Sequence, residues 1–157
     1  VGGMAFYESS IQSAIVEAQS VGRAAFACCP DLVHVSLGDD TIRVYDRAFR
    51  ADHSLVSVNL NDVQEIWHDA FNDCDALERV TIPAAADFVS STAFWGCASL
   101  KEVAFEKTSD WFLCQRDENF DYVPVAAADL SDPAANVELL GGELESYVYR
   151  RIPGYEI

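Results

Sequence analysis

The chain has 157 residues, of which half are apolar and 11% are aromatic, enough to build a core and to exclude an intrinsically disordered protein. Its net charge of -16, from 26 acidic and 10 basic residues, disfavours nucleic acid and anionic lipid surfaces as partners, and it either serves solubility or attracts a basic partner. No apolar run approaches the roughly 18 to 20 residues that a membrane-spanning helix needs, so no direct membrane insertion is expected.

The first 106 residues contain an internal repeat of about five coils, with phenylalanine as its most regular feature. In four copies, Ala directly precedes the Phe, Leu follows six residues later and Val nine residues later, while Val or Ile recurs five residues before it. A looser copy opens the chain; it begins within a repeat at Val1, so further coils or a cap are expected upstream. Successive phenylalanines are 20, 23, 22 and 23 residues apart. They are Phe6, Phe26, Phe49, Phe71 and Phe94.

Each copy predicts one short strand and one tight turn. The segment from the Leu to the second residue after the Val ends in an apolar-x-apolar alternation, which favours a strand with one face inward. The A-F-x-x-C segment predicts a tight helical or 3₁₀ turn on the opposite side. One copy gains about 10–15 kcal/mol from apolar burial, whereas ordering its backbone costs on the order of 20–40 kcal/mol. The copies must therefore stack as coils of a solenoid, with the five phenylalanines in one interior file.

The chain has five cysteines, an odd number without the CxxC spacing of a zinc site. Three of them stand three residues after the Phe of their copies, which favours a structural role as small buried residues. Asp52 takes this position in another copy. Cys74 and Cys97 belong to adjacent coils and could be bridged, whereas Cys29 lies two coils from Cys74, too far for a disulfide. The cysteines are Cys28, Cys29, Cys74, Cys97 and Cys114.

The segments AFNDCDALERVTIP at 70–83 and VGRAAFACCPDLVHVSL at 21–37 resemble the BspA-like class of leucine-rich repeats, a bacterial surface protein type with the pattern AF..C.sL..v.iP after V..IG. AFRADHSLVSVNL at 48–60 departs from this pattern at Asp52, where a Cys is expected. The resemblance covers residues 1 to about 106. It implies a parallel-stranded α/β leucine-rich-repeat solenoid, a cell-surface or secreted location, and adhesion or binding of a protein or other extracellular ligand. It implies no catalytic residue.

The outward residues of the predicted strands vary between copies, which makes them candidates for ligand binding. They lie eight and ten residues after each Phe, between the inward Val and Leu positions. Leucine-rich repeat proteins commonly bind partners on this concave sheet, so the resemblance implies a binding face here; a merely solvated sheet surface is the alternative. The candidates are His34, Ser36, Ser57, Asn59, Arg79, Thr81 and Glu102.

Residues 107–157 lie outside the repeat and predict a small α+β segment. Apolar residues at 111–114 and 122–125 favour two short strands around a polar turn at 115–119. SDPAANVELLGG at 131–142 predicts a helix that Ser131 or Asp132 caps, and ESYVYRR at 145–151 predicts a final strand. Because the end of a solenoid needs covering, we expect residues 107–157 to form a C-terminal cap; an independent binding module is the alternative.

No pattern in the chain predicts catalysis, a metal site or a cofactor. The sequence lacks a nucleophile elbow, a phosphate-binding loop and a zinc-binding HExxH motif. His34, His53 and His68 fall at different positions of their coils, so we do not expect them to converge on one metal. The predicted function is a non-enzymatic binding or adhesion module. A structural spacer within a larger surface protein is one alternative, and an enzyme that uses Cys28 or Cys114 is another.

Overall fold

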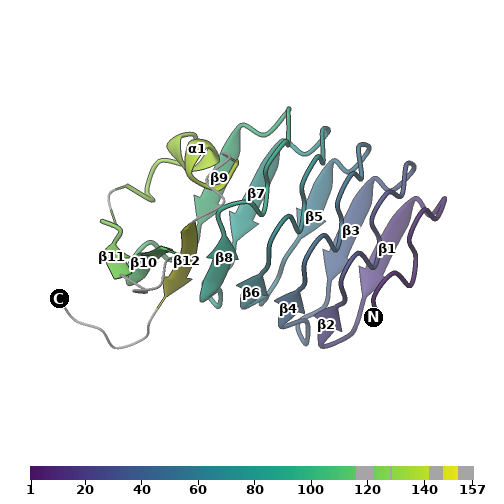
Figure 1. Cartoon of the computed structure of the whole chain (residues 1–157), viewed down its shortest axis with the longest axis horizontal. Coiled ribbons are helices and arrows are strands. Elements are labelled where there is room, and N and C mark those ends of the chain that lie inside the picture. The colour runs from purple at the N-terminus through teal and green to yellow at the C-terminus, as the bar shows by residue number, and fades with distance from the viewer. Residues whose placement is uncertain (116–121, 128, 142–146, 152–157) are drawn as a thin grey trace.

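The repeat region folds into a solenoid of stacked coils. The structure is a computed structural model and describes residues 1–115, 122–127, 129–141 and 147–151. Successive coils lie side by side from the N-terminus towards the C-terminal segment, with a longer strand on one side of each coil and a shorter strand on another (Figure 1). Neighbouring coils pair in parallel, so the repeat builds the parallel-strand solenoid that the sequence predicts.

The longer strands form the side that we call the strand face. Its strands are organised into two parallel sheets, β1-β3-β5 and β7-β9. The register joins equivalent positions of neighbouring coils, so that Val35 pairs with Val58 and Val80 with Val103. The strands are β1 (Ser13–Val16), β3 (His34–Leu37), β5 (Ser57–Asn59), β7 (Arg79–Ile82) and β9 (Glu102–Phe105).

A second set of strands contains the apolar position five residues before each Phe. Val21, Val44, Ile66 and Val89 are fully buried there, and Val21 pairs with Val44 in parallel register. The sequence marks this position as a recurring apolar residue but gives no strand signal, because two residues are too few to show an alternation. These strands are β2 (Ser20–Val21), β4 (Arg43–Val44), β6 (Glu65–Ile66) and β8 (Phe88–Ser90).

The predicted helical or 3₁₀ turns are not confirmed: residues 1–106, all of which the structure describes, contain no helix. The A-F-x-x-C segments form single hydrogen-bonded turns instead. The residue two after each Phe has positive φ, and in four coils so does the residue two before it, for example 59° at Ala51 and 58° at Arg47, which prevents a helix from continuing. Their amides bond to the next coil, as Ala51 N donates to Asn72 O, so the turns act as a third ladder between coils.

The phenylalanine file exists as predicted. Rings of successive coils stack with centroids 4.9 to 5.4 Å apart and nearly parallel planes. Phe26, Phe49, Phe71 and Phe94 are at most 2% exposed, whereas Phe6 is 42% exposed. The expectation that every Phe lies in the shared core is therefore wrong for Phe6, whose ring stacks on that of Phe26 alone among the described residues.

The repeat cysteines connect each coil to the one before it. The thiol of Cys29 donates to Phe6 O at 3.1 Å, that of Cys74 to Phe49 O at 3.1 Å, and that of Cys97 to Phe71 O at 3.0 Å. All three are free thiols, so Cys74 and Cys97 are not bridged. The structural role that the sequence predicts agrees with these contacts.

Asp52 occupies the corresponding place in the intervening coil and is completely buried. One of its oxygens, Oδ1, accepts a hydrogen bond from Cys29 N at 2.7 Å, while Oδ2 has no partner. Burial raises the pKa of Asp52 to about 8, because the charged carboxylate is disfavoured away from water. The exception to the cysteine pattern is thus a buried acid that holds its proton near neutral pH.

The C-terminal segment contains the predicted elements and closes against the solenoid. Strands β10 (Trp111–Gln115), β11 (Tyr122–Pro124) and β12 (Tyr147–Arg151) pair antiparallel, and β12 also pairs antiparallel with β8. Helix α1 (Ala135–Gly141) follows the Asp132 carboxylate, which accepts the amide of Ala134 at 3.0 Å. The predicted polar turn lies largely outside the described residues. The domain division at residue 106 stays a prediction.

Candidate functional site

The seven candidate residues of the strand face lie in two outward columns, and neighbouring coils align them. His34 pairs in register with Ser57, Ser36 with Asn59, and Arg79 with Glu102, while Thr81 lies beside Ala104. Ser36 is half-buried and the other six residues are exposed. The alternation of the strands brings them to one face, as the sequence predicts; their role in binding stays a prediction.

Contacts across the strands hold several of these side chains. His34 Nδ1 and Ser57 Oγ are 2.8 Å apart, and Arg79 Nε lies 3.0 Å from Glu102 Oε2. These side chains are well exposed, so the ion pair contributes little to stability and the polar groups can exchange partners with a ligand.

Two shallow depressions mark the strand face. The first, of about 390 Å³, lies over β1, β3 and β5 and is lined by residues that include His34, Ser36, Ser57 and Asn59. The second, of about 290 Å³, lies between β5 and β7, and its lining includes Asn59, Arg79 and Thr81. Ile15, which is 80% exposed, adds an apolar side chain to the first depression. The face therefore offers both polar groups and an apolar contact.

The histidines do not converge, in agreement with the sequence. His34 contacts Ser57, His53 lies 2.7 Å from Asp75 Oδ2, and His68 lies 2.7 Å from Ser90 Oγ. In the described part of the chain, no group of three or more His, Cys, Asp or Glu side chains is placed to hold a metal ion.

The buried cysteines are poor nucleophiles. Burial raises the pKa of Cys29 to about 11 and that of Cys74 well above its usual value, so both remain thiols at neutral pH. Cys28 is half-buried, and the side chain of Cys114 lies outside the described residues.

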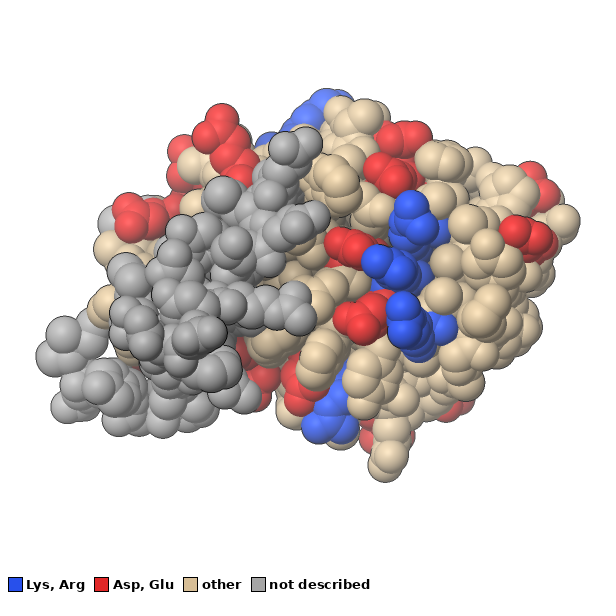
Figure 2. Space-filling view, in the orientation of Figure 1, with Lys and Arg blue, Asp and Glu red and all other residues tan. Residues whose placement is uncertain are grey.

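Another pocket, of about 480 Å³, opens on the turns that carry the phenylalanines, and we call it the turn pocket. Side chains from several successive coils line it. Figure 2 shows Lys and Arg side chains gathered in a file near the middle of the repeat region, with Asp and Glu side chains directly beside them. The lining residues are Arg23, Asp46, Arg47, Arg50, His68, Asp69, Asn72, Thr92 and Trp95.

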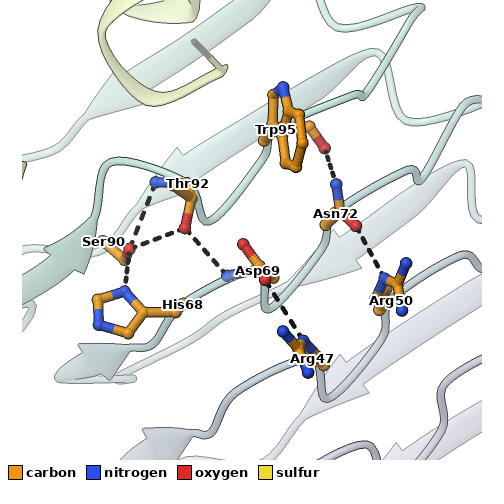
Figure 3. Close-up of polar contacts among 8 residues, drawn as sticks. All are labelled: Arg47, Arg50, His68, Asp69, Asn72, Ser90, Thr92 and Trp95. Atoms are coloured by element: carbon orange, nitrogen blue, oxygen red, sulfur yellow. Dashed lines mark hydrogen bonds and ion pairs between the residues drawn. The ribbon is translucent and has the colours of Figure 1, made fainter. Parts of the chain in front are cut away.

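Two chains of hydrogen bonds run across the turn pocket from coil to coil (Figure 3). The first follows the residues directly after each Phe. In it, Asn72 Nδ2 donates to Trp95 O at 2.8 Å, and Asn72 Oδ1 accepts from Arg50 Nε at 3.0 Å. The second follows the residues two before each Phe. There Thr92 Oγ1 accepts from Asp69 N at 3.3 Å, and the Asp69 carboxylate lies 3.4 Å from Arg47 Nε. Both chains fix the orientation of arginine side chains.

The pocket holds the unpaired cations of the repeat region. Arg43, Arg47, Arg79 and Lys101 each form an ion pair with a neighbouring coil. Arg23 and Arg50, in contrast, form no ion pair with any residue that the structure describes, since the partner of Arg50 is a neutral amide. In a chain with 26 acidic and 10 basic residues, two cations without a carboxylate partner in one pocket are unexpected.

The sequence analysis missed the turn pocket. Its residues occupy variable positions around the A-F pair, where the copies share no residue type, and no short motif joins them. The signal that the sequence does hold is the column of residues directly after each Phe, where Tyr7, Ala27, Arg50, Asn72 and Trp95 follow one another at repeat spacing. A second column consists of the residues two before each Phe. The two columns become neighbours only when the coils stack, which the sequence alone does not show.

Stacked coils with inward Leu and Val columns and variable outward columns define a leucine-rich repeat protein. The family model for the BspA type leucine rich repeat region matches residues 1–112 in six copies, so the chain belongs to this family. A search of curated proteins finds no significant match. Proteins of this fold are typically non-enzymatic scaffolds, and leucine-rich repeat domains generally bind proteins.

Solved structures of bacterial leucine-rich repeat proteins are similar to this chain. A leucine-rich repeat protein of T. pallidum is 29% identical with a TM-score of 0.63, over 66% of this chain and 50% of that one. One from Bacteroides ovatus is 22% identical with a TM-score of 0.55, over 66% and 33% of the two chains. A leucine rich cell surface protein from Faecalibacterium prausnitzii is 18% identical with a TM-score of 0.48, over 63% and 33%. The matched region thus spans half or less of these proteins.

Proposed function

We propose that this chain is a non-enzymatic protein-binding or adhesion module of a microbial cell-surface or secreted leucine-rich repeat protein, and that the strand face holds the partner. The observation that carries the proposal is the alignment of seven variable, mostly exposed side chains on one face, six of which line two adjacent depressions. An exposed Ile15 supplies an apolar contact, and the surrounding hydroxyl, amide and guanidinium groups supply hydrogen bonds. This combination suits a protein surface. The net charge of -16 argues against nucleic acid.

Binding of purified extracellular proteins to the immobilised chain tests this proposal. Asn59→Arg/Thr81→Arg places two bulky cations in the predicted contact, so it should reduce binding at least ten-fold. Gln19→Arg/Gln64→Arg makes the same charge change at exposed positions next to β2 and β6 and is the matched control. Equal loss in both variants would show a charge effect without a specific face, and unchanged binding in both would move the site away from the strand face.

A structural spacer is the second candidate function. It is favoured by the comparison with the T. pallidum protein, of which the matched region covers only 50%. The function of a spacer depends on the number of coils, which sets its length, and not on the identity of the outward residues. Replacing all seven candidate residues by Ala in the full-length protein would then leave binding intact. A protein that loses binding on this replacement uses the strand face directly.

The surface location belongs to the same proposal and rests on the family. Antibody labelling of intact cells, compared with lysed cells, tests it: labelling of intact cells is expected. Within the described ranges, no helix has the length and apolar character needed to cross a membrane.

A further inference from the structure

The turn pocket combines groups that a purely structural surface has no need for. Arg50 is held in place by its Nε, which donates to Asn72 Oδ1 at 3.0 Å. Its two terminal amino groups have no partner among the described residues, and Arg23 in the same lining likewise forms no ion pair. A guanidinium that is oriented through one nitrogen and free at the others is prepared for a carboxylate, which it binds through two parallel hydrogen bonds.

The other groups of the pocket indicate what else a ligand carries. Trp95 is 37% exposed and lies in the lining, so part of a large flat ring is available for contact. Thr92, Asn72 and His68 offer both donors and acceptors, and Asp46 and Asp69 offer acceptors only. A ligand that satisfies them has one acidic group, several hydroxyl groups that donate and accept, and an apolar face.

We propose that the turn pocket binds an acidic sugar, with the carboxylate on Arg50, the hydroxyl groups on the polar side chains and the C–H face of the ring against Trp95. The volume of about 480 Å³ suits one or two sugar rings, within the range of about 300–1,000 Å³ typical of small-ligand sites. The pocket lies away from the strand face, so this binding is separate from the proposed capture of a protein.

Two other anionic ligands fit less well. An acidic peptide brings several carboxylates close to Asp46 and Asp69, which repel them, while its backbone leaves few hydroxyl groups for these acceptors. A polyanion such as nucleic acid meets the repulsion of a chain with a net charge of -16. A sugar with a single carboxylate escapes both penalties, because its charge stays on Arg50 and its hydroxyl groups reach the aspartates.

Titration of the protein with small glycosides tests the inference. The probes are methyl β-D-glucuronide and methyl β-D-galacturonide, with neutral methyl β-D-glucoside as the matched control. Binding is followed by NMR through the indole N–H signals, since Trp95→Phe identifies the signal of Trp95 among the three tryptophans. At least one uronide should shift this signal and bind at least ten-fold more tightly than the glucoside.

Variants then assign the contact. Arg50→Gln should lower uronide affinity at least ten-fold, to the level of the glucoside, while Arg50→Lys keeps the charge but not the paired hydrogen bonds and should lose less. Arg43→Gln removes a half-buried arginine of the same coil outside the pocket and should bind the uronide normally. Thermal unfolding of each variant shows whether the protein remains folded.

Defined results would overturn the inference. They are no uronide binding at 20 mM, equal binding of uronide and glucoside, or unaltered binding in Arg50→Gln. Binding of the peptide acetyl-Asp-Ala-Asp-amide as tightly as a uronide would assign the pocket to acidic peptides instead. None of these measurements involves the strand face, so they leave the protein-binding proposal to its own test.

Discussion

At residue scale, Asp52 is the least expected side chain of the core. The cysteines at the equivalent positions each donate a thiol proton to a Phe carbonyl of the preceding coil. Asp52 stands at the same repeat position, but its Oδ2 has no hydrogen-bond partner among the described residues, so the carboxyl group keeps a proton rather than a buried charge that no group compensates. The raised pKa, about 8, keeps this proton in place at neutral pH.

The stability of the protein should therefore fall as pH rises. The unfolded pKa of an aspartate is about 3.9, so between about pH 4 and pH 8 the folded chain holds a proton that the unfolded chain releases. The contribution of Asp52 is complete below pH 4 and is lost as pH rises towards 8, with a slope of at most about 1.4 kcal/mol per pH unit. Guanidinium unfolding at several pH values measures this.

The variant Asp52→Asn isolates the effect. An amide keeps the acceptor for Cys29 N and supplies a donor that does not titrate, so it should stabilise the protein at pH 8 by about 1–3 kcal/mol and flatten the slope. Asp31→Asn removes an exposed carboxylate and is the matched control. A pH slope that persists in Asp52→Asn would show that other groups cause it.

At the scale of the element, each coil depends on two neighbours. The rings of Phe49 and Phe94 cover both faces of Phe71, at centroid distances of 5.2 and 5.4 Å. Phe6 has a ring neighbour on one side only, namely Phe26 at 4.9 Å. The same residue at the same repeat position therefore contributes differently in an inner and in an outer coil.

Phe71→Ala should lower the free energy of unfolding by about 3–5 kcal/mol, as expected for a large cavity in a core. Phe6→Ala should cost clearly less, about 1–2 kcal/mol, because its side chain is already 42% exposed. Chemical unfolding of both variants gives the comparison. A loss below 1 kcal/mol for Phe71→Ala, or equal losses for the two, would contradict the stacked interior file.

The turns depend on residues in the left-handed region. The position two after the Phe has positive φ in every coil and holds Glu8, Cys28, Ala51, Asp73 or Gly96. Only one of these is glycine, the residue that this conformation favours. Pairing with the next coil holds the others there, as Asp73 N donates to Trp95 O at 2.9 Å.

Gly96→Ala should destabilise the protein by about 1–3 kcal/mol. Its φ is 78°, and an added Cβ would collide with Asp73 Oδ1. Ala51→Gly, at φ 59°, should be neutral or stabilising by up to about 1 kcal/mol, because glycine relieves the strain and loses only chain entropy. Thermal unfolding measures both. Destabilisation by Ala51→Gly would show that loss of the methyl group outweighs the strain.

At the scale of the whole molecule, the inward side of the fold could be predicted from the sequence and the outward side only in part. Inward positions such as Phe49, Leu55 and Val58 repeat because each must fit the coil beside it, so they leave a periodic signal. The positive φ at Arg47 leaves no such periodic signal, since pairing with the next coil imposes this conformation on a residue that does not favour it. The sequence likewise gives no signal for the turn pocket, because Arg50, Asn72 and Trp95 share a surface only after three coils have stacked.

The C-terminal segment is joined to the last coils by buried polar contacts. Asn136 of α1 is fully buried, and its Nδ2 donates to Val103 O in β9 at 2.8 Å and to Leu130 O at 3.0 Å. In return, Val103 N donates to Pro133 O at 2.8 Å, and Phe94 N donates to Leu140 O at 3.3 Å. On the basis of these contacts, we propose that residues 107–157 form a cap that unfolds together with the coils rather than an independent module.

Asn136→Ala tests this coupling. Removing an amide that donates to two buried carbonyl groups should cost about 2–4 kcal/mol, because both acceptors are left without a partner and without water. Glu138→Ala, at an exposed position of α1, should stay within about 0.5 kcal/mol of the parent. If the segment is a cap, circular dichroism and tryptophan fluorescence report one transition that shifts as a whole in Asn136→Ala. An independent module would give two transitions, of which the variant moves only one, and the coils would keep their stability without it.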